Sequence, residues 1–331
     1  MRTSYLLKPR AILLLCLLLP LLLIMGGVFT GSQPFSWLLN TEVGQTVLWQ
    51  IRLPRALLGF LVGAALAWAG VLIQGIVRNP LADPGLIGVS GGAAVGVALV
   101  LWLSSLGLSL PAQAIPLAAA AGAALALLFV LRIGGSQSAF QDMGFLILAG
   151  IAVSVMTGAV IGLLAYLSSD QALRQIMYWS MGSLSSASWY WVALIAPVLT
   201  VALLLWPKRL QALDALLLGE VEARSLGVNV KRLQWQVVLW TALLVGVAVA
   251  ACGIIGFVGL VSPHLARLLT GASHKRVLPV AVCLGGTLLV LADMVARTLI
   301  APAEIPIGII TSLIGGPLFI SLLLRERRQS V

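Results

Sequence analysis

Charged residues are scarce in this chain of 331 residues. Asp, Glu, Lys and Arg together make up 9% of it, whereas they make up about 25% of a typical soluble domain. Hydrophobic residues account for 60%, and the mean hydropathy is +1.09. This composition excludes an ordinary soluble enzyme or binding domain. It predicts an all-α protein that crosses a membrane several times.

Residues that could bind a metal or form a catalytic cluster are also few. The two histidines, His264 and His274, have no carboxylate or cysteine at ligand spacing. Cys16, Cys252 and Cys283 lie in apolar runs without the spacing of a disulfide framework or a metal site. We therefore expect neither a metal site nor catalytic residues. The Walker pattern GxxxxGK[ST] is absent, so the chain has no visible means of hydrolysing ATP.

Acidic residues inside the apolar runs are equally rare. Asp293 is the only one well inside a predicted membrane segment, and Arg297, four residues later, could pair with it on one helix face. Transporters that are driven by protons or sodium usually place ionisable groups near the middle of the membrane. Their scarcity counts against an ATP-independent secondary transporter, which stays open as an alternative.

The apolar runs indicate ten membrane segments. Nine runs have spanning length, at roughly 11–29, 56–77, 86–104, 113–132, 144–167, 190–206, 235–252, 277–298 and 306–324. The first could be a signal peptide, but no small-x-small cleavage site follows it. The run at 260–270 is too short to span and is expected to be a half-helix buried among the others. We thus predict one transmembrane domain, residues 1–331, with both termini in the cytoplasm.

The net charge of +10 supports this orientation. Arg52, Arg55, Arg174 and Arg297 would lie outside, and the remaining Lys and Arg residues would lie in the cytoplasm, as the positive-inside rule requires. Nine segments would put the basic C-terminal tail outside. The excess of cations is therefore attributed to membrane orientation and not to nucleic-acid binding.

One polar stretch, residues 214–235, interrupts the apolar sequence. Its carboxylates and cations alternate with apolar residues, and Gly219 and Gly227 bracket the part from Glu220 to Leu226. This pattern predicts two short amphipathic helices that are broken at Gly227. Such helices could form a docking surface for a soluble partner, or could lie on the membrane surface.

Several motifs together resemble the permease subunit of type II ABC importers. They are WQIRLPRALLGFLVGAALAWAGVLIQGIVRNPLADPGLIGVSGGAAVG, LRQIMYWSMGSLSSASW, LLGEVEARSLGV, GFVGLVSPHLAR and APAEIPIGIITSLIGGPLFI, which occur in family order from about residue 46 to 324. That family carries iron-siderophores, haem and vitamin B12 across the bacterial inner membrane. Two loops, YWSMGSLSSASW and NPLADPGLIGVS, are closer to haem permeases, so haem is expected first, then a ferric siderophore, then vitamin B12.

The resemblance also implies partners and sites. It implies a homodimer with the pathway between the two copies, two cytoplasmic subunits that bind ATP and Mg, and a periplasmic substrate-binding protein. No cofactor would be bound by this chain itself. Alternating access would be driven through coupling helices at about 214–229, and the ATPase would meet Gly219, Glu220, Glu222, Ala223, Arg224 and Gly227.

Two further sets of residues match family positions. Arg52, Arg55 and Arg297 match positions that receive acidic residues of the binding protein; without the resemblance, they could simply extend to the membrane interface. Asn79 and Leu81 fall at one cytoplasmic gate, and Met143 and Gly144 at the other. The family often has small hydroxyl residues at this second gate, and here the chain departs from the pattern.

Overall fold

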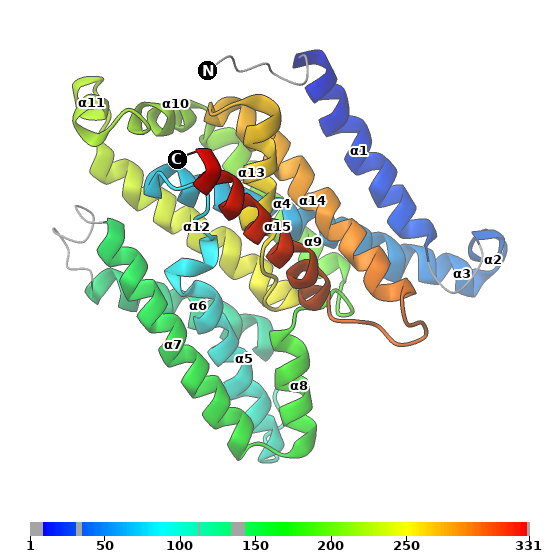
Figure 1. Ribbon diagram of the computed structural model, residues 1–331. Coiled ribbons are helices and arrows are strands. Elements are labelled where there is room, and N and C mark those ends of the chain that lie inside the picture. The colour runs from blue at the N-terminus through cyan, green and yellow to red at the C-terminus, as the bar shows by residue number, and fades with distance from the viewer. Residues whose placement is uncertain (1–8, 31–34, 112, 134–142, 330–331) are drawn as a thin grey trace.

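The computed structural model describes residues 9–30, 35–111, 113–133 and 143–329, and every regular element in this part of the chain is helical (Figure 1). A helix lies at each of the ten predicted ranges. These helices are α1 (Pro9–Phe29), α4 (Leu53–Val77), α5 (Val89–Ser105), α6 (Ala114–Ile133), α7 (Met143–Leu167), α9 (Trp189–Leu205), α12 (Val230–Cys252), α13 (Val258–Thr270), α14 (His274–Thr298) and α15 (Ile307–Gln329).

Length and composition identify membrane-crossing helices more strictly. By these criteria four helical stretches in the described residues could cross a membrane: residues 42–77, 148–167, α12 and α14. A fifth is added if α9 and the following α10 (Pro207–Leu216), which are bent by 65° at their junction, are counted as one span. The all-helical membrane architecture is therefore confirmed.

Shorter elements connect the long helices. They are α2 (Phe35–Asn40), α3 (Glu42–Val47), the π-helical turn η1 (Leu48–Arg52), the 3-10 turn η2 (Pro84–Ile87), α8 (Asp170–Ser180), α10 and α11 (Glu220–Ser225). In Figure 1, α10, α11, the beginning of α1 and the end of α15 lie on one side of the molecule, whereas α2, α3 and α8 lie toward the opposite side. The two ends of the described chain thus share a side with α10 and α11.

Helix α4 forms the centre of the bundle, and it is buried along most of its length. Small residues allow its neighbours to approach closely, as is common in membrane proteins. A Cβ atom at Gly63 would overlap the carbonyl group of Gly285 in α14, and a Cβ atom at Gly70 would overlap that of Gly259 in α13. The backbones of α4, α13 and α14 therefore lie in direct contact.

The predicted half-helix is confirmed as short and buried. Helix α13 has 13 residues, and most of its side chains are inaccessible. Helix α7, in contrast, is long and mostly exposed: only 22% of its apolar span is buried within the chain.

The prediction for the polar stretch is wrong in one respect. The chain breaks at Gly227 as predicted, between α11 and α12, but it also breaks at Gly219, so that the two short helices are α10 and α11 and the part after Gly227 belongs to the long helix α12. Gly219 has φ +128°, which L-residues rarely adopt, whereas Gly227, with φ +82°, follows the end of α11. The first helix also begins earlier than expected, at Pro207, where a proline fits the first turn of a helix.

Candidate docking, coupling and gating sites

Residues 207–229 contain the predicted coupling helices (about 214–229) and are called the coupling segment. Several of their apolar side chains are exposed to solvent. Val221 is 76% exposed, Leu218 is 68% exposed and Leu226 is 65% exposed, while Ala223 is buried and faces the rest of the chain. Side chains of this size are rarely left exposed in a contiguous group unless a partner covers them. The geometry thus fits a docking surface, and α11 points away from the bundle (Figure 1).

The charged residues of α11 surround this apolar surface. Arg224 lies 3.4 Å from Glu220 one helical turn away, in an exposed ion pair that contributes little to folding. Glu222 folds back toward Gly219, where a Cβ atom would overlap its carboxylate. Glu220 and Arg224 therefore contribute little to the stability of the fold, and both side chains are at least partly accessible to a partner.

Helix α10 is held against the beginning of α14 by Asp214. The carboxylate accepts hydrogen bonds from the backbone N–H of His274 at 2.7 Å and from the hydroxyl of Ser273 at 2.9 Å. The Nδ1 atom of His274 lies 2.7 Å from the same carboxylate. Partial burial raises the pKa of Asp214, but these hydrogen bonds outweigh it, so that the pKa lies below its ordinary value. Asp214 is therefore ionised at neutral pH.

The loop after α4 contains the first pair of predicted gate residues. Asn79 is exposed, and its side-chain oxygen accepts a hydrogen bond of 2.8 Å from the backbone N–H of Leu81. The preceding Arg78 adopts a left-handed conformation, φ 54°, and ends α4. These two features form a tight turn that fixes the path of the loop.

Met143 and Gly144, the second predicted gate, are the first residues of α7. Their side-chain surroundings lie outside the described part of the structure. Their assignment as a gate remains a prediction.

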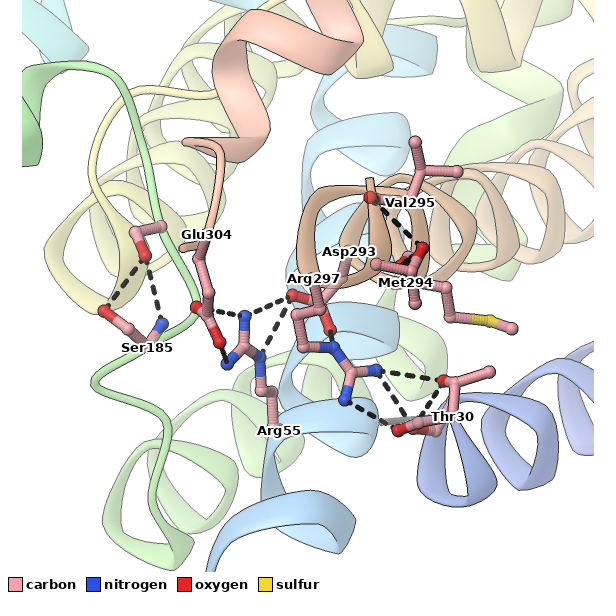
Figure 2. A network of polar contacts seen from close by, with 11 residues as sticks. Thr30, Arg55, Ser185, Asp293, Met294, Val295, Arg297 and Glu304 are labelled. Carbon is pink, nitrogen blue, oxygen red and sulfur yellow. Dashed lines mark hydrogen bonds and ion pairs between the residues drawn. The ribbon is translucent and has the colours of Figure 1, made fainter. Parts of the chain in front are cut away.

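An ion-pair network connects the beginning of α4, the last turns of α14 and the loop before α15 (Figure 2). Arg55 donates to Asp293 through Nε at 3.0 Å and Nη2 at 2.8 Å, and to the two oxygens of Glu304 at 2.9 Å each. Asp293 also lies 3.0 Å from Nε of Arg297, which confirms the predicted pair on one helix face. Arg55 and Asp293 are buried, whereas the side chain of Glu304 is 40% exposed.

The three predicted docking arginines are thus buried or nearly so. Arg297 also donates to the carbonyl groups of Gly27 and Thr30 at the end of α1, and Arg52 donates to the carbonyl of Val28. Their guanidinium groups are paired within the bundle, and their assignment as a docking site stays a prediction. Such buried guanidinium groups require these partners, because an unpaired buried charge is costly.

Sequence reasoning missed two partners in these sites. Glu304 was part of a recognised motif, but nothing in its local sequence linked it to Arg55, 249 residues away. The contact between Asp214 and His274 spans 60 residues and was missed for the same reason. The position of Ser273 and His274 at the start of a long helix was the available signal, because such residues often bind an acidic group.

Two cavities between the helices are large enough to be compared with a ligand site. A groove of about 320 Å³ is lined by residues of α5, α6, α8, the loop after α8 and α12, among them Tyr178, Ser183 and Ser185. A second cavity of about 380 Å³ between α1, α13, α14 and α15 is almost entirely apolar. In the described residues no group of three or more His, Cys, Asp and Glu side chains could hold a metal ion. Neither cavity therefore offers a cage of metal-binding side chains.

The sequence of the chain matches the model of the FecCD transport family over residues 12–325. The chain belongs to the FecCD transport family. The hemin transport system permease protein HmuU of Yersinia pestis is 43% identical over 97% of this chain and 98% of its own length. The vitamin B12 import system permease protein BtuC of Vibrio cholerae is 41% identical over 89% of this chain and 87% of its own length.

A solved structure supports the same assignment for the fold. It is described as an inward-facing conformation of an ABC transporter assigned to the metal-chelate type, and it matches with a TM-score of 0.86 and 36% identity. The match covers 96% of this chain and 100% of that one. The resemblance to the permeases of type II ABC importers is therefore confirmed. As a FecCD permease, the chain is a multi-pass membrane transport subunit of a bacterial ABC importer, without ATPase activity or a cofactor of its own.

Proposed function

We propose that this FecCD permease moves haem from the periplasm to the cytoplasm across the bacterial inner membrane. The observation that carries the proposal is the 43% identity to the hemin permease HmuU along nearly the whole of both chains. Vitamin B12 is the second candidate, because BtuC is only slightly less similar. A ferric siderophore is the third.

The working unit would be a homodimer with two ATP-binding subunits and a periplasmic binding protein. Ten segments, including the half-helix α13, would place both termini and the coupling segment in the cytoplasm. The common side of α10, α11 and the two ends of the described chain supports this topology (Figure 1). The exposed apolar residues of α11 would contact the ATPase, together with Gly219, Glu220, Glu222, Ala223, Arg224 and Gly227.

The binding protein would dock at the opposite side, near the arginines of the ion-pair network. Arg55 is satisfied by Asp293 and Glu304, so an incoming carboxylate would have to replace the exposed Glu304. Arg52 and Arg297 would keep their contacts to α1 and set the position of the site. Charge complementarity of this kind fixes orientation and raises the association rate.

Transport would follow from alternating access without covalent chemistry. ATP binding would move the coupling segment, and the gates at Asn79 and Leu81 and at Met143 and Gly144 would change accessibility in turn. Ligands shift such an equilibrium only by their different affinities for the two states. A cavity wall without a metal-binding cage fits a pathway that releases its cargo.

The test is substrate uptake by the reconstituted complex. Permease and ATPase would be placed together in liposomes and offered haem, a ferric siderophore or cobalamin, each on its cognate binding protein. We expect accumulation of haem that requires hydrolysable ATP. Uptake of cobalamin or the siderophore alone would replace haem by that compound, and uptake driven by an ion gradient without ATP would contradict the importer mechanism.

A further inference from the structure

The contact between Asp214 and the beginning of α14 joins two parts that a transport cycle must move together. Three polar groups converge on this one carboxylate: the backbone N–H and the ring of His274, and the hydroxyl of Ser273. Hydrogen bonds to a charged acceptor are stronger than neutral ones, and a carboxylate at a helix N-terminus gains further from the helix dipole. Helix α10 is therefore firmly attached to α14.

The imidazole ring of His274 extends this connection to α4. The ring is almost fully buried, at 1% exposure, and Nε2 lies against Gly75, where a Cβ atom would be only 2.7 Å from it. Within the described residues Nε2 has no hydrogen-bond partner. The proton is therefore placed on Nδ1, which donates to Asp214. The ring is held between a carboxylate of α10 and the backbone of α4.

The residue before Gly75 holds the gate loop. The amide nitrogen of Gln74 donates to the carbonyl of Ala82 at 3.2 Å and to that of Leu260 in α13 at 3.3 Å. Its oxygen accepts a hydrogen bond from Arg267. Gln74 is 2% exposed, so its hydrogen bonds are shielded from water. The last turns of α4 thus fix the loop that contains Asn79 and Leu81.

We propose that Asp214 and His274 form a rigid link that carries movement of the coupling segment, through Gly75 and Gln74, to the gate loop after α4. Asp214 is a positioning residue in this scheme, and the ATPase itself acts elsewhere on α11. The proposal rests on the proposed function, because it takes α10 and α11 as the segment that the ATPase moves. A contiguous chain of contacts connects the two segments, and measured coupling tests whether it carries the movement.

A matched control exists on the same helix. Arg209 of α10 donates to Gln236 of α12 at 3.0 Å, and this contact attaches α10 to the bundle without involving α14 or α4. Gln236→Ala would loosen α10 while leaving the link intact. Any effect that merely reflects a loosened α10 should therefore appear in this variant as well.

The first measurement is the amount of substrate imported per ATP hydrolysed by the reconstituted complex. Asp214→Asn keeps the shape of the side chain and removes its charge, and we expect the ratio to fall about tenfold, as for loss of a strong hydrogen-bond pair. Ser273→Ala removes one of the three contacts and should lower the ratio less. Gln236→Ala should stay within about twofold of the parent, as a site outside the link. An unchanged ratio in Asp214→Asn, or an equal fall in Gln236→Ala, would overturn the link.

A second measurement separates a broken link from a general defect. Spin labels at Leu218 and Leu81 would report the coupling segment and the gate loop, in a background without the three native cysteines. In the parent complex, ATP should change both spectra. In Asp214→Asn, ATP should still change the spectrum at Leu218 but no longer that at Leu81. If both sites still respond, the link is wrong; if the parent itself shows no ATP-dependent import, the proposed function fails independently of the link.

Discussion

Glu304 holds Arg55 through two hydrogen bonds of 2.9 Å, one to each carboxylate oxygen (Figure 2). The rest of the guanidinium group is engaged by Asp293. Glu304 therefore occupies, within the chain, the position that an acidic residue of a binding protein would need. Docking at Arg55 would be an exchange of carboxylates, with Glu304 as the group displaced toward solvent.

Glu304→Gln should strengthen binding of the binding protein. Without its charge, the side chain at 304 competes less well with a carboxylate of the binding protein for Arg55, while Asp293 still neutralises Arg55. We expect the affinity to rise about fivefold, which is the usual contribution of a partly exposed charged contact. Surface plasmon resonance with the complex in nanodiscs would measure it. The affinity of the variant should also fall more steeply with added salt than that of the parent. Equal or weaker binding by Glu304→Gln would contradict the exchange.

Asp293→Ala should destabilise the chain. It would leave Arg55 with one partner and deprive Arg297 of its carboxylate, and loss of one partner of a buried ion pair costs about 3–5 kcal/mol. Thermal unfolding in detergent would show a clear decrease in Tm. Arg224→Ala is the matched control, because it removes an exposed ion pair and should leave Tm nearly unchanged. A parent-like Tm for Asp293→Ala would show that the network has no structural role.

Val221→Ser should weaken association with the ATPase and leave folding unaffected. The side chain is 76% exposed in the isolated chain, so its removal takes nothing from the core. Burial of one such side chain in an interface contributes about 1.5 kcal/mol or more, which corresponds to about tenfold in affinity. Titration of ATPase against the detergent-solubilised permease would measure the change. Unaltered affinity would place the ATPase on another surface.

Gly63→Ala should lower stability because its Cβ atom would overlap the carbonyl group of Gly285, and backbone atoms cannot move aside as a side chain can. We expect a loss of about 1–3 kcal/mol, the usual effect of overpacking. Gly158→Ala in α7 is the control, because apart from the neighbouring backbone of α7 no atom of the described residues lies within 4 Å of its added Cβ. Equal Tm values for the two variants would contradict the close contact of α4 and α14.

The sequence was most informative where a property is local. The runs of apolar residues predicted a helix at each of the ten ranges, the short α13 included, because length and hydropathy depend on neighbouring residues only. The Asp293–Arg297 pair could be predicted because residues four apart share a helix face. Both glycines that bracket Glu220 to Leu226 have a positive φ and interrupt the helices. The glycines alone could not show that α10 precedes Gly219 and that the long helix α12 follows Gly227.

The features that the sequence did not predict depend on contacts between residues far apart in the chain. The three predicted docking arginines were expected to receive acidic residues of a binding protein, but Glu304 and the carbonyl groups of α1, far away in sequence, already contact them. The contacts of His274 could not be predicted, because they are made to Asp214 and Gly75 from two other helices. Helix α8 was not predicted as a separate element, since its 11 residues are amphipathic and too short for a membrane segment.

The glycine contacts of α4 also bear on which parts can shift during a transport cycle. Helices that meet backbone to backbone at Gly63 and Gly70 have no intervening side chains whose rotamers could absorb a displacement. Helices α4, α13 and α14 must therefore travel as one rigid body. Only 22% of the apolar span of α7 is buried within the chain, so fewer internal contacts hold α7 in place. We therefore expect the transport cycle to keep α4, α13 and α14 together and to move α7, which begins at Met143, against them.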